Sequence, residues 1–142
     1  MTEAKIKYLE LIQNVISRMN ANSFKIKGWM ITVLSALLAL YANGKNDLYI
    51  YLAIVPILLF WILDAYYLQQ ERKYRKLYED IISEESNVQL FKMSTENYAN
   101  ITFVKVLFSK TLLWLYGCVV LLYLLYFLFS KCCVSFSFSI NC

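Results

Sequence analysis

The chain has 142 residues, of which 60% are hydrophobic and 17% are charged. Soluble domains average about 45–50% apolar and about 25% charged residues, so this composition argues against an ordinary soluble domain and for a single membrane-embedded unit. The chain contains no histidine, which removes the commonest general base and the usual catalytic metal ligand. We therefore expect no enzyme activity, no cofactor and no metal site.

The N-terminal segment has the pattern of an amphipathic helix over residues 4–19. Its apolar stripe follows helical spacing and consists of Leu9, Ile12, Ile16 and Met19. Polar residues from Asn20 to Ser23 are expected to end this helix. Two interpretations stay open: the stripe packs on the rest of a cytoplasmic domain, or the helix lies in the plane of the lipid headgroups.

Three apolar runs follow, at residues 24–42, 48–68 and 111–130. A helix needs about 20 residues to cross a hydrocarbon core of about 30 Å, so each run predicts a transmembrane helix. The first run reaches this length only if Lys25 and Lys27 extend toward the headgroups. Residues 43–47, NGKND, are turn-forming, and they predict a tight hairpin between the first two spans.

The basic residues define an orientation. All of the 14 lysines and arginines except Lys45 and Lys131 fall in residues 1–27 or in the stretch between the second and third spans. The positive-inside rule then predicts an N-terminus inside the cell and a C-terminus outside. The expected organisation is a cytoplasmic helix (1–23), three spans (24–42, 48–68, 111–130), an external turn (43–47), a cytoplasmic helical region (69–110) and an external tail (131–142).

The second span continues into charged sequence without an interrupting glycine or proline, which predicts one helix from about Leu48 to about Ser83. Glu71 and Arg75 have the spacing of an ion pair on one helix. A basic group just below the membrane is expected to anchor the helix on anionic lipid. Its members are Arg72, Lys73, Arg75 and Lys76.

A row of hydroxyl side chains follows the third span at seven-residue steps. The row consists of Ser109, Tyr116, Tyr123 and Ser130. One interpretation is hydrogen bonding between helices together with an aromatic belt. The other is the lining of a narrow pore in an oligomer, with Pro56 of the second span as a hinge.

Small residues on one face of the first span predict a second feature, a helix-packing face. This face consists of Gly28, Thr32, Ser35, Ala36 and Ala39.

Asp64 lies among apolar residues about four positions inside the cytoplasmic end of the second span, and a carboxylate at this depth must face protein or water. The structural interpretation is an ion pair with Lys27 or Lys110, with Trp29 or Ser109 as further donors. The functional interpretation is an acidic ring at the inner mouth of a cation pathway.

The cysteines divide into two groups. Cys118 lies within the third span, where we interpret it as a small packing residue. Cys132, Cys133 and Cys142 lie in the tail, where an external, oxidising compartment would allow disulfides. The tail sequence VSFSFSI alternates like a strand, although one short strand cannot build a sheet.

Three stretches together resemble a known group of proteins: NSFKIKGW before the first span, LDAYYLQQERKYRKLY leaving the second, and KVLFSKTLLWLYG entering the third. They are similar to small membrane effectors of bacterial anti-phage defence cassettes, of the Hailong or retron type, over roughly Tyr8 to Gly117. The resemblance implies an oligomer that depolarises the inner membrane when a partner senses infection. That partner would be a sensor, or the product of a nucleotidyltransferase or reverse transcriptase.

The sequence therefore predicts an all-α, three-span homo-oligomer of the bacterial inner membrane that forms or gates a pore and is controlled through its cytoplasmic helices. Two alternatives stay open. One is a membrane anchor or adaptor that recruits a cytoplasmic partner without conducting ions. The other is a pore of the holin or toxin type that acts alone. Direct binding of nucleic acid is not indicated.

Overall fold

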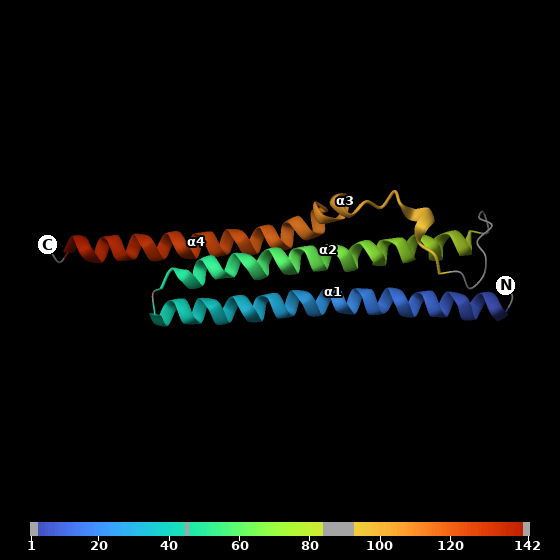
Figure 1. Cartoon of the computed structure of the whole chain (residues 1–142), viewed down its shortest axis with the longest axis horizontal. Helices are drawn as coiled ribbons and strands as arrows, with labels where there is room; N and C mark the ends of the chain where they lie inside the picture. The colour runs from blue at the N-terminus through green and yellow to red at the C-terminus, as the bar shows by residue number, and fades with distance from the viewer. Residues whose placement is uncertain (1–2, 45, 84–92, 141–142) are drawn as a thin grey trace.

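The computed structural model describes residues 3–44, 46–83 and 93–140, with side chains up to residue 129. Within these ranges every regular element is a helix, which confirms the all-α expectation. The elements are α1 (Glu3–Gly44), α2 (Leu48–Ile82), a short 3-10 helix η1 (Glu96–Tyr98), α3 (Phe103–Leu107) and α4 (Lys110–Ile140). Figure 1 shows the three long helices lying side by side, with α2 between α1 and α4.

α1 and α2 form one long antiparallel hairpin. Of the predicted turn at residues 43–47, Asn43 and Gly44 belong to α1, Asn46 and Asp47 precede α2, and Lys45 lies outside the described residues. With 42 and 35 residues, α1 and α2 measure about 63 Å and about 52 Å at the standard rise, well beyond a hydrocarbon core of about 30 Å. α2 passes through Pro56 and ends at Ile82, as the sequence predicts. Each helix therefore has one part suited to a membrane and another part that must lie outside it.

Three helices are long and apolar enough to cross a membrane, within Glu3–Gly44, Leu48–Ile82 and Lys110–Phe129. This confirms three membrane-length helices in the described chain. The direction in which they would cross stays a prediction.

The expected end of the first helix at Asn20–Ser23 is wrong, because α1 continues through these residues to Gly44. Asparagine and serine have weak helix propensity but neither breaks a helix, and packing decides such cases. Here α2 lies alongside α1 on both sides of the polar residues, and Ser23 itself is buried at 5% exposure. The expected N-terminal helix and the first span are thus one continuous helix.

The alternating sequence of the tail is typical of a strand, but the tail is helical, since α4 continues through Ile140. A strand needs a partner, and no strand exists in the described chain. Continuing the helix satisfies the backbone hydrogen bonds locally. In Figure 1 the end of α4 extends beyond the turn that joins α1 and α2.

Two separate cores hold the helices together. The membrane core consists of Met30, Leu34, Tyr41, Ile50, Ala53, Ile57, Ala65, Leu112, Tyr116 and Tyr123. The hairpin core consists of Tyr8, Leu9, Ile12, Ile16, Leu77 and Ile81. Leu9, Ile12 and Ile16 of the amphipathic stripe therefore pack on α2, as the first interpretation expected, whereas Met19 is only partly buried. That this part of the chain is cytoplasmic stays a prediction.

Residues 93–107 return along α2 toward the membrane core. Tyr98 packs against the hairpin core, and its hydroxyl donates a 2.7 Å hydrogen bond to Oδ2 of Asp80. Gln69 of α2 donates a 2.7 Å hydrogen bond to the carbonyl oxygen of Ile101. α3 then forms at the approach to the third span and buries Val106. We call residues 93–102 the return segment.

Only a narrow face of α4 is buried against the other helices, and we call this contact between α4 and the hairpin the seam. Leu112, Tyr116 and Tyr123 face the other helices, with Val119 partly buried among them. Successive steps of four, three and four residues are those of a seam between two helices. Most other large side chains of α4 up to Phe129 are exposed, so they are suited to contact lipid or another copy.

Candidate functional site

Asp64 is fully buried, at 0% exposure, where α1, α2 and α4 meet. Lys27 Nζ lies 2.8 Å from its Oδ1 and 2.7 Å from its Oδ2. The hydroxyl of Ser23 donates a 2.5 Å hydrogen bond to Oδ1, and the hydroxyl of Tyr116 lies 3.3 Å from Oδ2. We call Ser23, Lys27, Asp64 and Tyr116 the polar cluster.

Each long helix contributes to the polar cluster through its own periodicity. Ser23 and Lys27 are four residues apart on α1, so they lie on one face, and Lys27 Nζ is 2.6 Å from the Ser23 hydroxyl oxygen. Tyr116 follows Leu112 by four residues in the buried seam of α4. Its single hydroxyl proton has two acceptors, Oδ2 of Asp64 at 3.3 Å and the carbonyl oxygen of Phe60 at 3.1 Å. The carboxylate of α2 is thereby bonded to both neighbouring helices.

All three tryptophans of the chain lie near the level of the polar cluster. Trp29 follows Lys27 by two residues, Trp61 precedes Asp64 by three, and Trp114 precedes Tyr116 by two. Trp61 stacks on Tyr116 with ring centroids 6.0 Å apart, and its indole nitrogen donates to the carbonyl oxygen of Leu107 at 3.1 Å. Tryptophan is enriched at membrane–water boundaries, so this level is suited to one face of the bilayer.

The negative charge of Asp64 is balanced by a single positive group, the ammonium group of Lys27. A carboxylate withdrawn from water is stable only when it is paired and hydrogen-bonded, and the cluster meets both conditions. The Lys27 side chain keeps 23% exposure, whereas the Asp64 side chain has none. Lys27 therefore reaches Asp64 from the edge of the bundle, and a long lysine side chain can alternatively extend toward lipid headgroups.

This arrangement can do two things chemically. It ties three helices together at one point, because the carboxylate accepts hydrogen bonds from α1 and α4 at once. It also holds the Asp64 carboxylate next to Lys27, so that movement of the lysine side chain would leave the carboxylate without its ion-pair partner. An uncovered carboxylate with two nearby hydroxyl groups is a set of oxygen ligands suited to a cation.

The sequence-based prediction for Asp64 is confirmed in part. Of the two expected ion-pair partners, Lys27 forms the pair and Lys110 does not. Neither expected donor is correct: the Asp64 carboxylate is bonded by Ser23 and Tyr116, and the hydroxyl of Ser109 has no hydrogen-bond partner among the described residues. Trp29 is 65% exposed on the outside of the bundle. The sequence analysis does not predict Ser23 as a partner of Asp64, because it expects the helix to end there. The spacing of four residues between Ser23 and Lys27 does indicate that both lie on one helix face.

The hydroxyl row of the third span turns inward. Tyr116 and Tyr123 are 2% and 9% exposed and belong to the membrane core. The hydroxyl groups of Ser109 and Tyr123 are buried, and neither has a hydrogen-bond partner among the described residues. The side chain of Ser130 lies outside the described part. Pro56 is half-buried within α2.

The small residues of the first span do not pack against α2 or α4, so that expectation is wrong within one chain. All five, Gly28, Thr32, Ser35, Ala36 and Ala39, are exposed. A methyl group added at Gly28 would have no neighbouring atom within 4 Å. The reason is volume: the α1–α2 interface is filled by larger side chains such as Met30 and Leu34.

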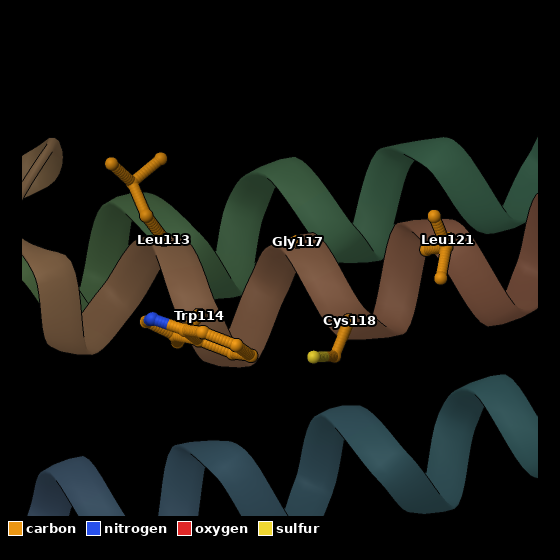
Figure 2. A pocket seen from close by; sticks show the side chains of 5 residues that line it. All are labelled: Leu113, Trp114, Gly117, Cys118 and Leu121. Carbon is orange, nitrogen blue, oxygen red and sulfur yellow. The ribbon is translucent and has the colours of Figure 1, made fainter.

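Cys118 is likewise exposed rather than packed, which corrects its interpretation. It lies with Gly117 in a shallow surface notch of α4 (Figure 2), with a volume of about 310 Å³. Trp114 and Leu121 border the notch at its two ends. The notch arises because glycine and cysteine are small between two large side chains.

The remaining predicted positions have mixed outcomes. Arg75 forms the expected pair with Glu71 at 2.8 Å, which confirms that pairing. Arg72 and Lys73 are half-buried and Lys76 is exposed, so anchoring on lipid stays a prediction. Cys132 and Cys133 lie within the helical part of α4, but their side chains, like the whole of Cys142, are outside the described part.

Comparison of the chain with protein-family models, curated proteins and solved structures finds no match. Within residues 3–44, 46–83 and 93–129, whose side chains are described, no group of histidine, cysteine and acidic side chains could hold a metal ion. The polar cluster is thus the arrangement of described residues on which a function can be argued.

Proposed function

We propose that the chain is a homo-oligomeric effector of the bacterial inner membrane that lets cations cross and so depolarises the cell. The observation that supports this proposal is a fully buried, paired carboxylate among three membrane-length helices. An ionisable residue at such a place is costly to keep, and it usually marks an ion or substrate pathway.

The structure corresponds to a closed state in this proposal. Lys27 neutralises Asp64, and Tyr116 bonds α4 to α2. Movement of Lys27 toward the headgroups uncovers the carboxylate and removes one of the ties between α1 and α2. Water and a cation then take the place of the ammonium group.

The hairpin core is the proposed receiver of the signal. α1 and α2 run without a break from the hairpin core into the membrane core, so a shift of one end is carried to Lys27 and Asp64. The trigger would be a cytoplasmic sensor, or the product of a nucleotidyltransferase or reverse transcriptase. The resemblance to anti-phage effectors supports this context, in which depolarisation stops phage production at the cost of the infected cell.

A second candidate function is a membrane anchor that recruits a cytoplasmic partner and conducts nothing. Complete neutralisation of Asp64 favours it, because a buried ion pair can also serve only to align helices. A pore of the holin type, acting without a partner, differs from the main proposal only in needing no trigger.

Membrane potential in bacteria tests the proposal. A voltage-sensitive dye would follow inducible expression of the wild type, Lys27→Gln and Asp64→Asn, with each protein quantified in the membrane. The glutamine can still donate a hydrogen bond to Asp64 but brings no charge, so we expect depolarisation without a trigger. Lys25→Gln is the matched control, since Lys25 is exposed two residues away.

The outcomes separate the candidates. Depolarisation by Lys27→Gln that is lost in Lys27→Gln/Asp64→Asn supports a gated cation pathway. Depolarisation by the wild type alone indicates a pore without a partner. An unchanged potential for every variant, including during phage infection, with normal membrane insertion, contradicts conduction and leaves the anchor.

A further inference from the structure

We propose that cations cross each protomer separately, along the seam between α4 and the α1–α2 hairpin, and not through a lumen shared by several copies. This inference rests on the proposed function and names the pathway. It follows from where α4 places its polar and apolar side chains.

The inner end of the seam is the polar cluster. Asp64 there is enclosed by α1 and α4 of the same chain, and at 0% exposure it cannot line a surface that another copy reaches. A carboxylate at the entrance of a narrow path attracts cations and repels anions. The selective group therefore belongs to the interior of one protomer.

The outer part of the seam contains Tyr123, two turns and about 10 Å along α4 from Tyr116. Its hydroxyl is buried and has no partner among the described residues, while the ring belongs to the membrane core. A buried hydroxyl without a hydrogen bond is costly, so such a group usually has a partner in some state of the protein. Water or a cation in the open seam would supply that partner.

An aromatic contact extends the seam toward the turn of the hairpin. The ring of Tyr126 meets the ring of Tyr41 of α1 edge to face, with centroids 6.0 Å apart. α1 and α4 of one chain thus approach each other beyond Tyr123. The seam passes from the polar cluster to this tyrosine pair between helices of the same protomer.

The outward face of α4 has the opposite character. Leu113, Trp114, Leu121, Leu122, Leu124 and Leu125 are all exposed. Figure 2 shows Leu113, Trp114, Cys118 and Leu121 projecting from the surface of α4. A lumen lined by this face would be apolar and would exclude water, and a pore without water does not conduct ions. This face is suited to lipid or to contact between copies.

Opening the seam requires little rearrangement of the hairpin. α4 contacts the hairpin through the narrow seam, through the hydroxyl of Tyr116 near Phe60 and Asp64, and through the ring of Tyr126 against Tyr41. The hydrogen bond from Trp61 to Leu107 lies just before α4 begins. A small outward displacement of α4 would let water reach Tyr123 while α1 and α2 stay paired.

Potassium flux into liposomes tests the inference with full-length protein carrying Lys27→Gln, the open form. Mixed oligomers would contain this form and Lys27→Gln/Asp64→Asn in known ratios. Separate pathways predict flux that falls in direct proportion to the fraction of the asparagine form. A shared lumen predicts a steeper fall, so that equal mixing leaves much less than half of the flux.

Two substitutions on opposite faces of α4 give an independent readout. In the same background, Tyr123→Phe should lower flux severalfold, whereas Leu121→Ser on the outward face should leave it unchanged. A steep mixing curve, or a flux that responds to Leu121→Ser and not to Tyr123→Phe, overturns the inference and leaves the proposed function. Absence of flux in every preparation overturns both.

Discussion

The two ends of the α1–α2 hairpin use the same pair of helices in opposite ways. Around the hairpin core, apolar side chains such as Ile12 and Leu77 are buried, and polar ones such as Glu10, Arg18 and Lys76 are exposed. Around the membrane core, leucine and isoleucine side chains cover the outside, while a carboxylate and a lysine meet inside. The comparison shows that the surrounding solvent, and not the helix pairing, decides which face carries charge.

The polar cluster lies where this reversal takes place. Toward the N-terminus of α1, burial of apolar area holds the helices together, since water drives apolar groups inward. Within the membrane that driving force is absent, and packing with hydrogen bonds must replace it. Substitutions in the two regions should therefore change stability for different physical reasons.

The largest effect is expected from Lys27→Met, which leaves the Asp64 carboxylate buried and unpaired. Breaking a buried pair from one side costs about 3–5 kcal/mol of stability. Thermal unfolding in detergent should show this loss, and Lys27→Met/Asp64→Leu should recover most of it. Lys25→Met, at an exposed neighbouring position, is the control and should change little. A single substitution as mild as this control would mean that Asp64 is not buried.

Leu77→Ala tests the hairpin core, where Leu77 is 2% exposed. Removing a buried leucine side chain costs about 2–5 kcal/mol through lost burial and the remaining cavity. Hydrogen exchange should increase in the N-terminal half of α1 and the C-terminal half of α2. The matched control is Leu11→Ala, since Leu11 is 47% exposed on the same helix. Equal effects of the two substitutions would contradict the packing of the hairpin core.

Tyr98→Phe tests the return segment. Burial and the hydrogen bond to the negatively charged Asp80 raise the pKa of Tyr98 to about 12 from the ordinary 10.0. Because the folded pKa lies above the unfolded one, this contribution to stability is present below pH 10 and is lost as the pH rises through about 12. Removing the hydroxyl should cost about 1 kcal/mol near neutral pH.

The check is the unfolding free energy of the wild type and Tyr98→Phe measured from pH 8 upward. The gap between the two should narrow across the interval between the unfolded and folded pKa values. A gap that stays constant would show that Asp80 does not accept this hydrogen bond.

The smallest effect on folding is expected from Gly28→Leu, because nothing lies within 4 Å of an added Cβ. Unfolding of the protomer should change by less than about 0.5 kcal/mol, as at other exposed positions. The oligomer fraction in detergent should fall if the small-residue face meets another copy. An unchanged oligomer would assign this face of α1 to lipid.

Much of the fold could be read from local patterns. The apolar lengths of the spans, the turn residues between the first two and the uninterrupted run from Leu48 past Glu71 each depend on residues close together in the chain. The two candidate partners of Asp64, Lys27 and Lys110, could be named because a membrane restricts the possible depth of every charge, but the choice between them could not be made. The continuity of α1 through Asn20 could not, since it depends on α2 lying alongside.

Local sequence patterns were enough to count the helices that can cross a membrane and to place the connection between the first two. The orientation that the basic residues predict is not tested by the fold. Which helix faces meet became clear only from the packing. It turned Tyr116 and Tyr123 inward, left the small residues from Gly28 to Ala39 exposed, and brought Ser23 to Asp64. The physical reason is that an almost uniformly apolar helix has no strong polar face in its sequence, so its rotation is chosen by a few polar contacts and by side-chain volume.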